Sequence, residues 1–160
     1  MNGLLWNLIL AVIWVAVTGK FTASNLLLGF ALGLLVLFFT RRIAGGPDYV
    51  YKVGQVIGLV LFFIVELILA NLRVAYDVLK PRYSMRPGIV AVPLDVRTDG
   101  QITLLTSLIM LTPGTLCLDV SEDRRVLYIH GMYVDDVETF RQKIKDGFER
   151  RVLEIFREPG

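Results

Sequence analysis

Cysteine, histidine and N-terminal charge are all scarce in this 160-residue sequence, and each scarcity excludes a class of protein. The single cysteine, Cys117, rules out an internal disulfide and, with no general base nearby, is expected to be a small core residue. The single histidine, His130, has no second soft ligand at motif spacing, so we expect no metal site. The sequence also contains no phosphate-binding loop, dinucleotide-binding glycine pattern, paired-cysteine motif or nucleophile elbow. We therefore expect a non-enzyme with no catalytic residue, no cofactor and no small-molecule substrate bound by this chain alone.

Charged side chains are concentrated in the second half of the chain. Between Met1 and Thr40 the only charged residue is Lys20, whereas most acids and bases follow Arg82. Apolar residues make up 54% of the chain, which exceeds the roughly 45–50% of a soluble domain. Basic residues are interleaved with acidic ones and the formal net charge is only +2, so no nucleic-acid binding is expected. These patterns predict a bilayer-embedded N-terminal half and a water-exposed C-terminal half.

Three apolar segments form the predicted membrane domain, residues 1–81. Helices are expected over about 4–18, 23–40 and 51–80, so that a short helical hairpin precedes a third, longer helix. The first two segments offer only about 14 to 18 apolar residues each, whereas about 20 are needed to cross roughly 30 Å of hydrocarbon. Either the bilayer thins around them, or the hairpin is re-entrant and supported by neighbouring proteins.

Four glycines and one acid stand out inside these segments. Gly29 with Gly33, and Gly54 with Gly58, have the GxxxG spacing that either marks a helix-packing seam or reflects the general frequency of glycine in membrane helices. Glu66 is a carboxylate within an apolar run, where a charge costs a few kcal/mol or more. It is a candidate for a proton or cation path. The alternatives are a protonated side chain or a structural contact near the headgroups.

Residues 82–88 are predicted to be a linker, and residues 89–160 a small α/β domain of order βαββα. Strands are expected over 89–96, 115–120 and 126–133, and helices over 101–111 and from Asp135–Asp136 onward. We expect this adjacent pair of carboxylates to cap the last helix and not to act in catalysis. A sheet with its helices on one face is the natural way to bury so few elements.

Three groups of short motifs are distinctive: Asn25 to Gly29 with Gly33, Arg73 to Pro81, and Ser107 to Val120 including Thr112, Pro113, Gly114 and Thr115. In this order and spacing they resemble the E subunit of the Mrp-type multisubunit cation/proton antiporters over nearly the whole chain. The resemblance implies an accessory subunit, needed for assembly and activity, in a bacterial plasma-membrane complex that exchanges sodium for protons. Its implied partners are other hydrophobic subunits and the lipid bilayer, and no catalytic residue is carried over. The alternative is a membrane-anchored regulatory or binding module that acts through its C-terminal domain.

The distribution of basic residues near the membrane ends predicts which side the C-terminal domain occupies. If the third helix crosses once, five basic residues lie on the side of the domain and three on the other: Lys20, Arg73, Lys80, Arg82 and Arg86 against Arg41, Arg42 and Lys52. The positive-inside rule then places the domain in the cytoplasm. The Arg41–Arg42 pair argues for the opposite orientation, or for a hairpin that does not fully cross.

Overall fold

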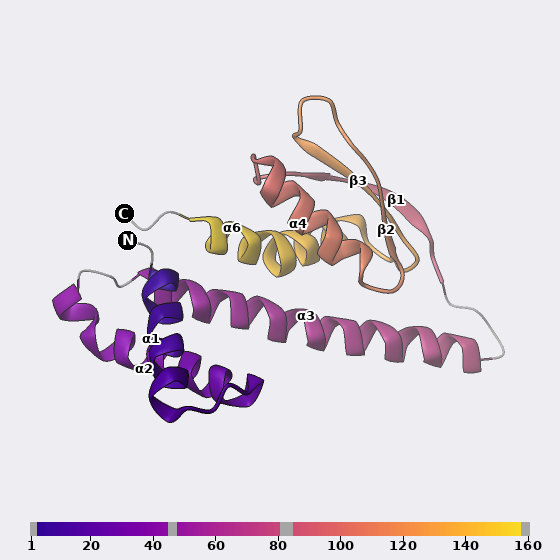
Figure 1. The fold of residues 1–160 in the computed structure, drawn as a ribbon. Coiled ribbons are helices and arrows are strands. Elements are labelled where there is room, and N and C mark those ends of the chain that lie inside the picture. The colour runs from indigo at the N-terminus through magenta and orange to yellow at the C-terminus, as the bar shows by residue number, and fades with distance from the viewer. Residues whose placement is uncertain (1–2, 45–47, 81–84, 158–160) are drawn as a thin grey trace. The chain divides into compact units, whose positions relative to one another are not determined.

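The computed structural model describes residues 3–44, 48–80 and 85–157, which fall into two compact units. One unit comprises residues 1–54 and the other residues 55–158, and each is described by itself. Pro81 and residues 82–84 of the predicted linker lie outside the described residues. The described elements follow the predicted order, with three helices before a three-stranded sheet and its helices (Figure 1).

The first unit is a helical hairpin made by α1 (Gly3–Thr18) and α2 (Ala23–Ala44). Gly19 turns the chain between them with a φ of 66°, a conformation that glycine adopts without strain. Asn25 fastens the turn, because its Nδ2 donates to Thr18 Oγ1 at 2.6 Å and to the Lys20 carbonyl at 2.8 Å. Its Oδ1 accepts from Trp14 Nε1 at 3.0 Å, so one amide ties both helices to the loop.

Length and composition allow two of the three N-terminal helices to cross a bilayer. The apolar stretches are Ala23–Thr40 in α2 and Tyr49–Leu79 in α3, which itself runs from Asp48 to Leu79. With 16 residues, α1 is shorter than a usual span. Most of α3, from Gln55 onward, belongs to the second compact unit.

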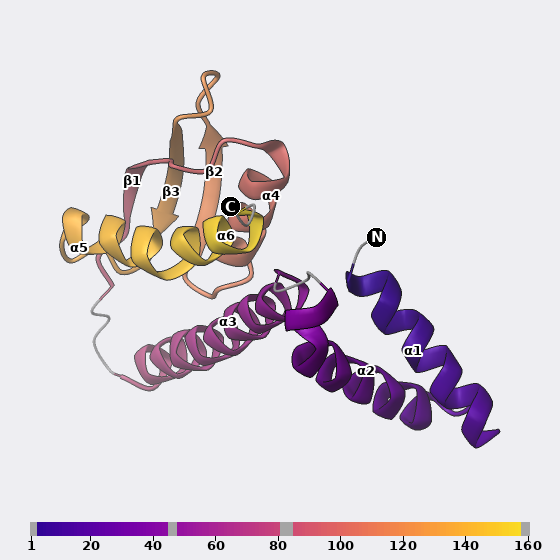
Figure 2. The same cartoon turned by 90° about the vertical axis from the view of Figure 1, so that its left-hand side faces the viewer.

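The rest of the second unit is an antiparallel sheet with its helices packed on one face (Figure 2). The strands β1 (Gly88–Pro93), β2 (Thr115–Val120) and β3 (Val126–Gly131) pair in the order β1-β3-β2, so the last strand is central. Between β1 and β2 lies α4 (Asp99–Met110). After β3 come α5 (Val137–Gln142), the π-helical segment η1 (Lys143–Glu149) and α6 (Arg150–Phe156), which follow one another without a break and are together called the last helix. The predicted fold class, membrane helices followed by a βαββα domain, is confirmed.

Alternation along the central strand builds the core of this domain. In β3, Leu127 and Ile129 are fully buried, whereas Tyr128 between them points to the opposite face of the sheet. Val90 and Val92 of β1 join them, together with a stripe of apolar residues from the helices. Leu59 of α3 is buried in the same core, so α3 is also a structural part of the α/β domain.

Local capping sets the helix starts. Thr98 and Gln101 form a reciprocal capping box at α4. At the last helix, Asp136 and not Asp135 is the cap, since its Oδ2 accepts from Thr139 N at 2.7 Å. This hydrogen bond lowers the pKa of the Asp136 carboxyl. The capping role expected for this carboxylate pair is therefore performed by its second member.

A buried carboxylate connects the end of β1 to the last helix. Glu149, only 1% exposed, accepts from the backbone N–H groups of Asp95 at 2.6 Å and Val96 at 3.0 Å. Lys145 pairs with Glu149 at 2.7 Å and with Asp95 at 2.6 Å. Although partial burial alone lowers the pKa of Lys145, the hydrogen bonds to Asp95 and Glu149 outweigh it and raise the pKa. The pairing explains how a carboxylate is tolerated inside an apolar core.

The hairpin provides a direct test of close helix packing. A Cβ added at Gly29 would lie 3.0 Å from both the Ala11 carbonyl oxygen and Trp14 Cβ, whereas one at Gly54 meets no described atom within 4 Å. We expect Gly29→Leu to destabilise the purified chain by roughly 1–3 kcal/mol or more through overpacking. Gly54→Leu is the matched control and should not lower the thermal unfolding midpoint in detergent. Equal midpoints for the two variants would contradict a tight seam at Gly29.

Candidate functional site

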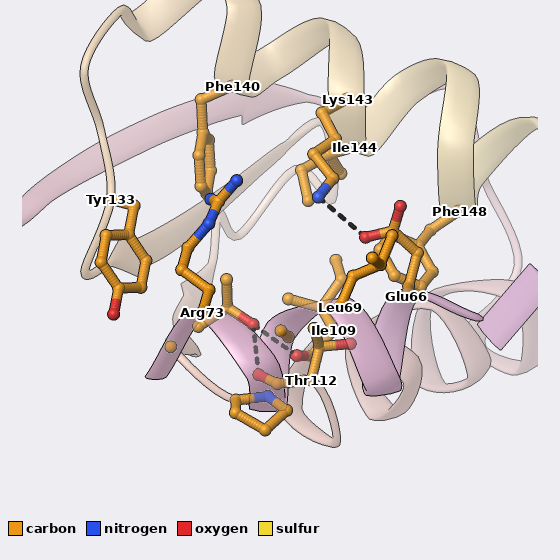
Figure 3. A pocket seen from close by; sticks show the side chains of 14 residues that line it. Glu66, Leu69, Arg73, Ile109, Thr112, Tyr133, Phe140, Lys143, Ile144 and Phe148 are labelled. Carbon is orange, nitrogen blue, oxygen red and sulfur yellow. Dashed lines mark hydrogen bonds and ion pairs between the residues drawn. The ribbon is translucent and has the colours of Figure 1, made fainter. Parts of the chain in front are cut away.

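A cavity of about 240 Å³ lies inside the second unit, between α3, the turn after α4 and the last helix (Figure 3). Its walls combine charged side chains with an apolar lining. The residues that carry its charge and polarity are Glu66, Arg73, Thr112, Thr115, Tyr133 and Lys143. Several residues singled out from the sequence therefore meet at one place.

Glu66 points from α3 toward the last helix and pairs with Lys143 (Figure 3). Its Oε2 lies 2.7 Å from Lys143 Nζ, and the Glu66 side chain is 14% exposed against 54% for the lysine. The partial burial strengthens the attraction between the two charges relative to a fully solvated pair, and the carboxylate no longer faces an apolar medium alone. Sequence reasoning identified the acid but missed its partner, because no local pattern marks Lys143 among the other charges of the last helix.

Arg73 and Asp77, about two and three turns beyond Glu66 along α3, both meet Tyr133. The Arg73 guanidinium lies 5.3 Å from the centre of the Tyr133 ring, within cation–π range. Asp77 is 3% exposed, and its carboxylate beside the phenol raises the pKa of Tyr133. The loop after β3 is thus held against the polar side of α3.

The Thr112-Pro113-Gly114-Thr115 turn closes the cavity at the end of α4. Thr112 Oγ1 donates to the Leu108 carbonyl at 3.0 Å, and Thr115 Oγ1 donates to the Ile109 carbonyl at 2.6 Å. These hydroxyls satisfy carbonyls that the end of the helix leaves without an intrahelical partner. Gly114 has a φ of 89°, which explains why glycine follows proline at this turn. The motif therefore shapes the start of β2.

Aromatic packing completes the contact and was not predicted from the sequence. Phe62 of α3 meets Phe148 edge to face with ring centroids 5.3 Å apart, and the Arg151 guanidinium lies 3.8 Å from the centre of the Phe62 ring. Gly147 sits in the π-helical segment, where a Cβ would approach Phe62 to 3.1 Å. Arg151 Nη1 donates to the carbonyls of Asp146 and Gly147, which compensates for the irregular helix.

The remaining residues selected from the sequence lie elsewhere. Asn25 fastens the hairpin turn, and Gly29 and Gly33 face α1, where a Cβ on Gly33 would overlap Asn7 Oδ1. A Cβ added at Gly54 or Gly58 would meet no described atom within 4 Å, so any partner of that face is outside the described chain. Pro81 lies outside the described residues.

The cavity offers one ion pair, Glu66 with Lys143, beside a mostly apolar lining. Among the described residues, no group of three or more His, Cys, Asp or Glu side chains is arranged to hold a metal ion. Cys117 does not line the cavity, and burial raises its pKa to about 11, so its thiol stays protonated near neutral pH. The geometry therefore serves to hold α3 on the α/β domain.

Comparison with known proteins relates this arrangement to a defined group of sequences. Residues 7–155 match the family MNHE, described as Na+/H+ ion antiporter subunit. The chain is 43% identical to the E subunit of the Na(+)/H(+) antiporter of Alkalihalophilus pseudofirmus, over 95% of this chain and 96% of that protein. It is 41% identical to the E subunit of the Na(+)/H(+) antiporter of Bacillus subtilis, over 96% of this chain and 98% of that protein.

Solved structures extend the similarity to the fold. A chain in the structure of the membrane-bound sulfane sulfur reductase, an archaeal respiratory membrane complex, is 30% identical with a TM-score of 0.60, and the match covers 96% of this chain and 98% of that one. A chain in the Mrp complex from Dietzia sp. DQ12-45-1b is 30% identical with a TM-score of 0.51, and the match covers 64% of this chain and 96% of that one.

Proposed function

Because this chain belongs to the family of E subunits of Na+/H+ antiporters, we propose that it is an accessory subunit of a multisubunit sodium/proton antiporter, needed for assembly and activity. The family membership suggested by the sequence motifs is thereby established. Other antiporter subunits and the lipid bilayer are its proposed partners. The chain contributes no catalytic site of its own in this proposal.

The observation that carries the accessory role is the engagement of Glu66. It is the only carboxylate between Asp48 and Asp77, and its 2.7 Å pair with Lys143 links two elements of the same chain. An ion path requires a carboxylate that exchanges its proton or cation with a continuous route. A carboxylate committed to a lysine is better suited to holding a helix in place.

Surface for partner subunits is available on the α/β domain as well as on the membrane helices. Near the end of α4 and along the edge strand β2, four large apolar side chains are 47–62% exposed: Met110, Leu111, Leu116 and Leu118. An edge strand also presents backbone groups that can pair with another chain. These features support docking against a neighbouring subunit.

Deletion of the subunit tests the accessory role. We expect removal of the chain to lower sodium/proton exchange in membrane vesicles and to reduce the amount of the remaining assembled complex in parallel. Affinity purification through this chain should also recover several hydrophobic subunits in fixed stoichiometry, whereas a free regulatory module would be recovered alone. Sodium/proton exchange by the purified chain in liposomes would contradict the accessory role.

Glu66 provides a second test. We expect Glu66→Gln to weaken the contact with Lys143 by about 1 kcal/mol and to lower exchange only as far as complex abundance falls. Lys143→Gln should give the same phenotype, and the charge swap Glu66→Lys with Lys143→Glu should restore part of the lost abundance. A fall in exchange at unchanged complex abundance in Glu66→Gln alone would instead support an ion-path role.

We also place the C-terminal domain in the cytoplasm. This is supported by the excess of basic residues on the side of the domain and by a single cysteine that needs no oxidising compartment. In a Cys117→Ser background, Glu158→Cys should react with a membrane-impermeant thiol reagent only after the cells are permeabilised. Labelling of intact cells would reverse this orientation.

A further inference from the structure

The charged residues of α3 and its C-terminal end follow a seven-residue repeat. Lys52, Leu59, Glu66, Arg73 and Lys80 are spaced by seven, with Leu59 the one uncharged member, and the other charged residues, Asp48 and Asp77, fall three or four residues from members of this series. Residues spaced by three, four and seven lie on one side of an α-helix. All charge between residues 48 and 80 is therefore confined to a single stripe.

Between Leu59 and Asp77, the residues of this stripe face the α/β domain. Leu59 is in the domain core, Glu66 pairs with Lys143, and Arg73 and Asp77 meet Tyr133. The opposite side of the helix is apolar and exposed along the same length. Its large members are Val56, Ile57, Val60, Leu61, Ile64, Val65, Ile68, Leu72, Val78 and Leu79, each 44% exposed or more.

The polar exception on this apolar side is Asn71, whose amide nitrogen turns back onto its own helix. Its Nδ2 donates to the Leu67 carbonyl at 2.7 Å. Tyr51 and Tyr76 are 69% and 60% exposed near the two ends of the helix. Tyrosines at such positions favour the boundary between lipid and water.

The α/β domain leaves too little of α3 uncovered for the helix to cross the bilayer. The 32 residues of α3 measure about 48 Å, against about 30 Å of hydrocarbon. The domain that covers residues 59–77 carries Lys143, Lys145, Asp146, Arg150 and Arg151 on its last helix, and such charges are costly in the bilayer core. Outside the covered stretch the helix has only residues 48–58 and 78–79, and residues 48–58 measure roughly 16 Å, too short to span the bilayer.

We infer that α3 lies in the plane of the membrane interface, with its apolar side in lipid and its polar stripe beneath the α/β domain. An amphipathic helix of this kind binds a bilayer by burying its apolar face about 5–10 Å into the boundary between headgroups and acyl chains. The stripe that usually faces water is here occupied by the domain. In this arrangement α3 holds the α/β domain against the membrane surface.

The distribution of basic residues supports this placement. If the α1–α2 hairpin crosses and α3 does not, the side of the domain holds Arg41, Arg42, Lys52, Arg73, Lys80, Arg82 and Arg86, and the other side holds only Lys20. Seven against one is a clear positive-inside pattern, whereas a crossing α3 leaves five against three. The Arg41–Arg42 pair then agrees with a cytoplasmic domain.

Two single-cysteine variants in the Cys117→Ser background decide between the arrangements. With a membrane-impermeant thiol reagent, Lys52→Cys and Glu158→Cys should react from the same side of the membrane. Reaction from opposite sides would show that α3 crosses and would overturn the inference. The side on which both react tests the cytoplasmic orientation separately, and the measurement does not depend on exchange activity.

The depth of individual α3 residues in the bilayer can be measured independently, on the intact complex in liposomes. Fluorophores attached to Ile57→Cys, Ile64→Cys, Ile68→Cys and Ala75→Cys should be quenched most by lipids brominated near the headgroup, at one similar shallow depth. Ala70→Cys is the matched control, since Ala70 lines the cavity and should be quenched least. A depth that passes through the bilayer centre between Ile57 and Ala75, or no quenching at any outer position because a partner subunit covers this face, would overturn the inference.

Discussion

The packing of α3 against the last helix is the interaction on which the arrangement of the second unit depends. Phe62 meets Phe148, Glu66 pairs with Lys143, and Leu59 enters the core built by the sheet. A long apolar helix normally hides its few polar groups from lipid in a bundle of helices. Here a folded α/β domain covers the polar groups of α3, and Lys143 and Tyr133 of the domain contact Glu66 and Arg73 of the helix.

The turn after α4 and the irregular last helix both support this contact. Thr112 and Thr115 fix the turn that closes the cavity, and the π-helical segment brings Gly147 against the Phe62 ring. Each feature breaks regular secondary structure at the place where two elements approach closely. The cavity between them is therefore a by-product of a shaped interface, consistent with an assembly role for the subunit.

The sequence predicts the fold class because its signals are local. Apolar runs mark the helices, alternation marks β3, and the Asp135–Asp136 pair marks the start of the last helix. The partner of Glu66 and the burial of Glu149 were missed because they arise from tertiary packing between distant segments. The seven-residue stripe on α3 is visible in the sequence, but the domain that covers it is identified only by the tertiary contacts of Glu66 and Arg73.

The position of Glu149 after all three strands also constrains how the protein is made. Its carboxylate caps the backbone after β1, and Phe148 and Val152 fill the same core, so that core closes only when the last helix has left the ribosome. Chains are synthesised from the N-terminus and domains fold as units. During synthesis, α3 therefore emerges well before the surface that will cover its charged side, and Glu66 lacks its partner Lys143 until the last helix has left the ribosome.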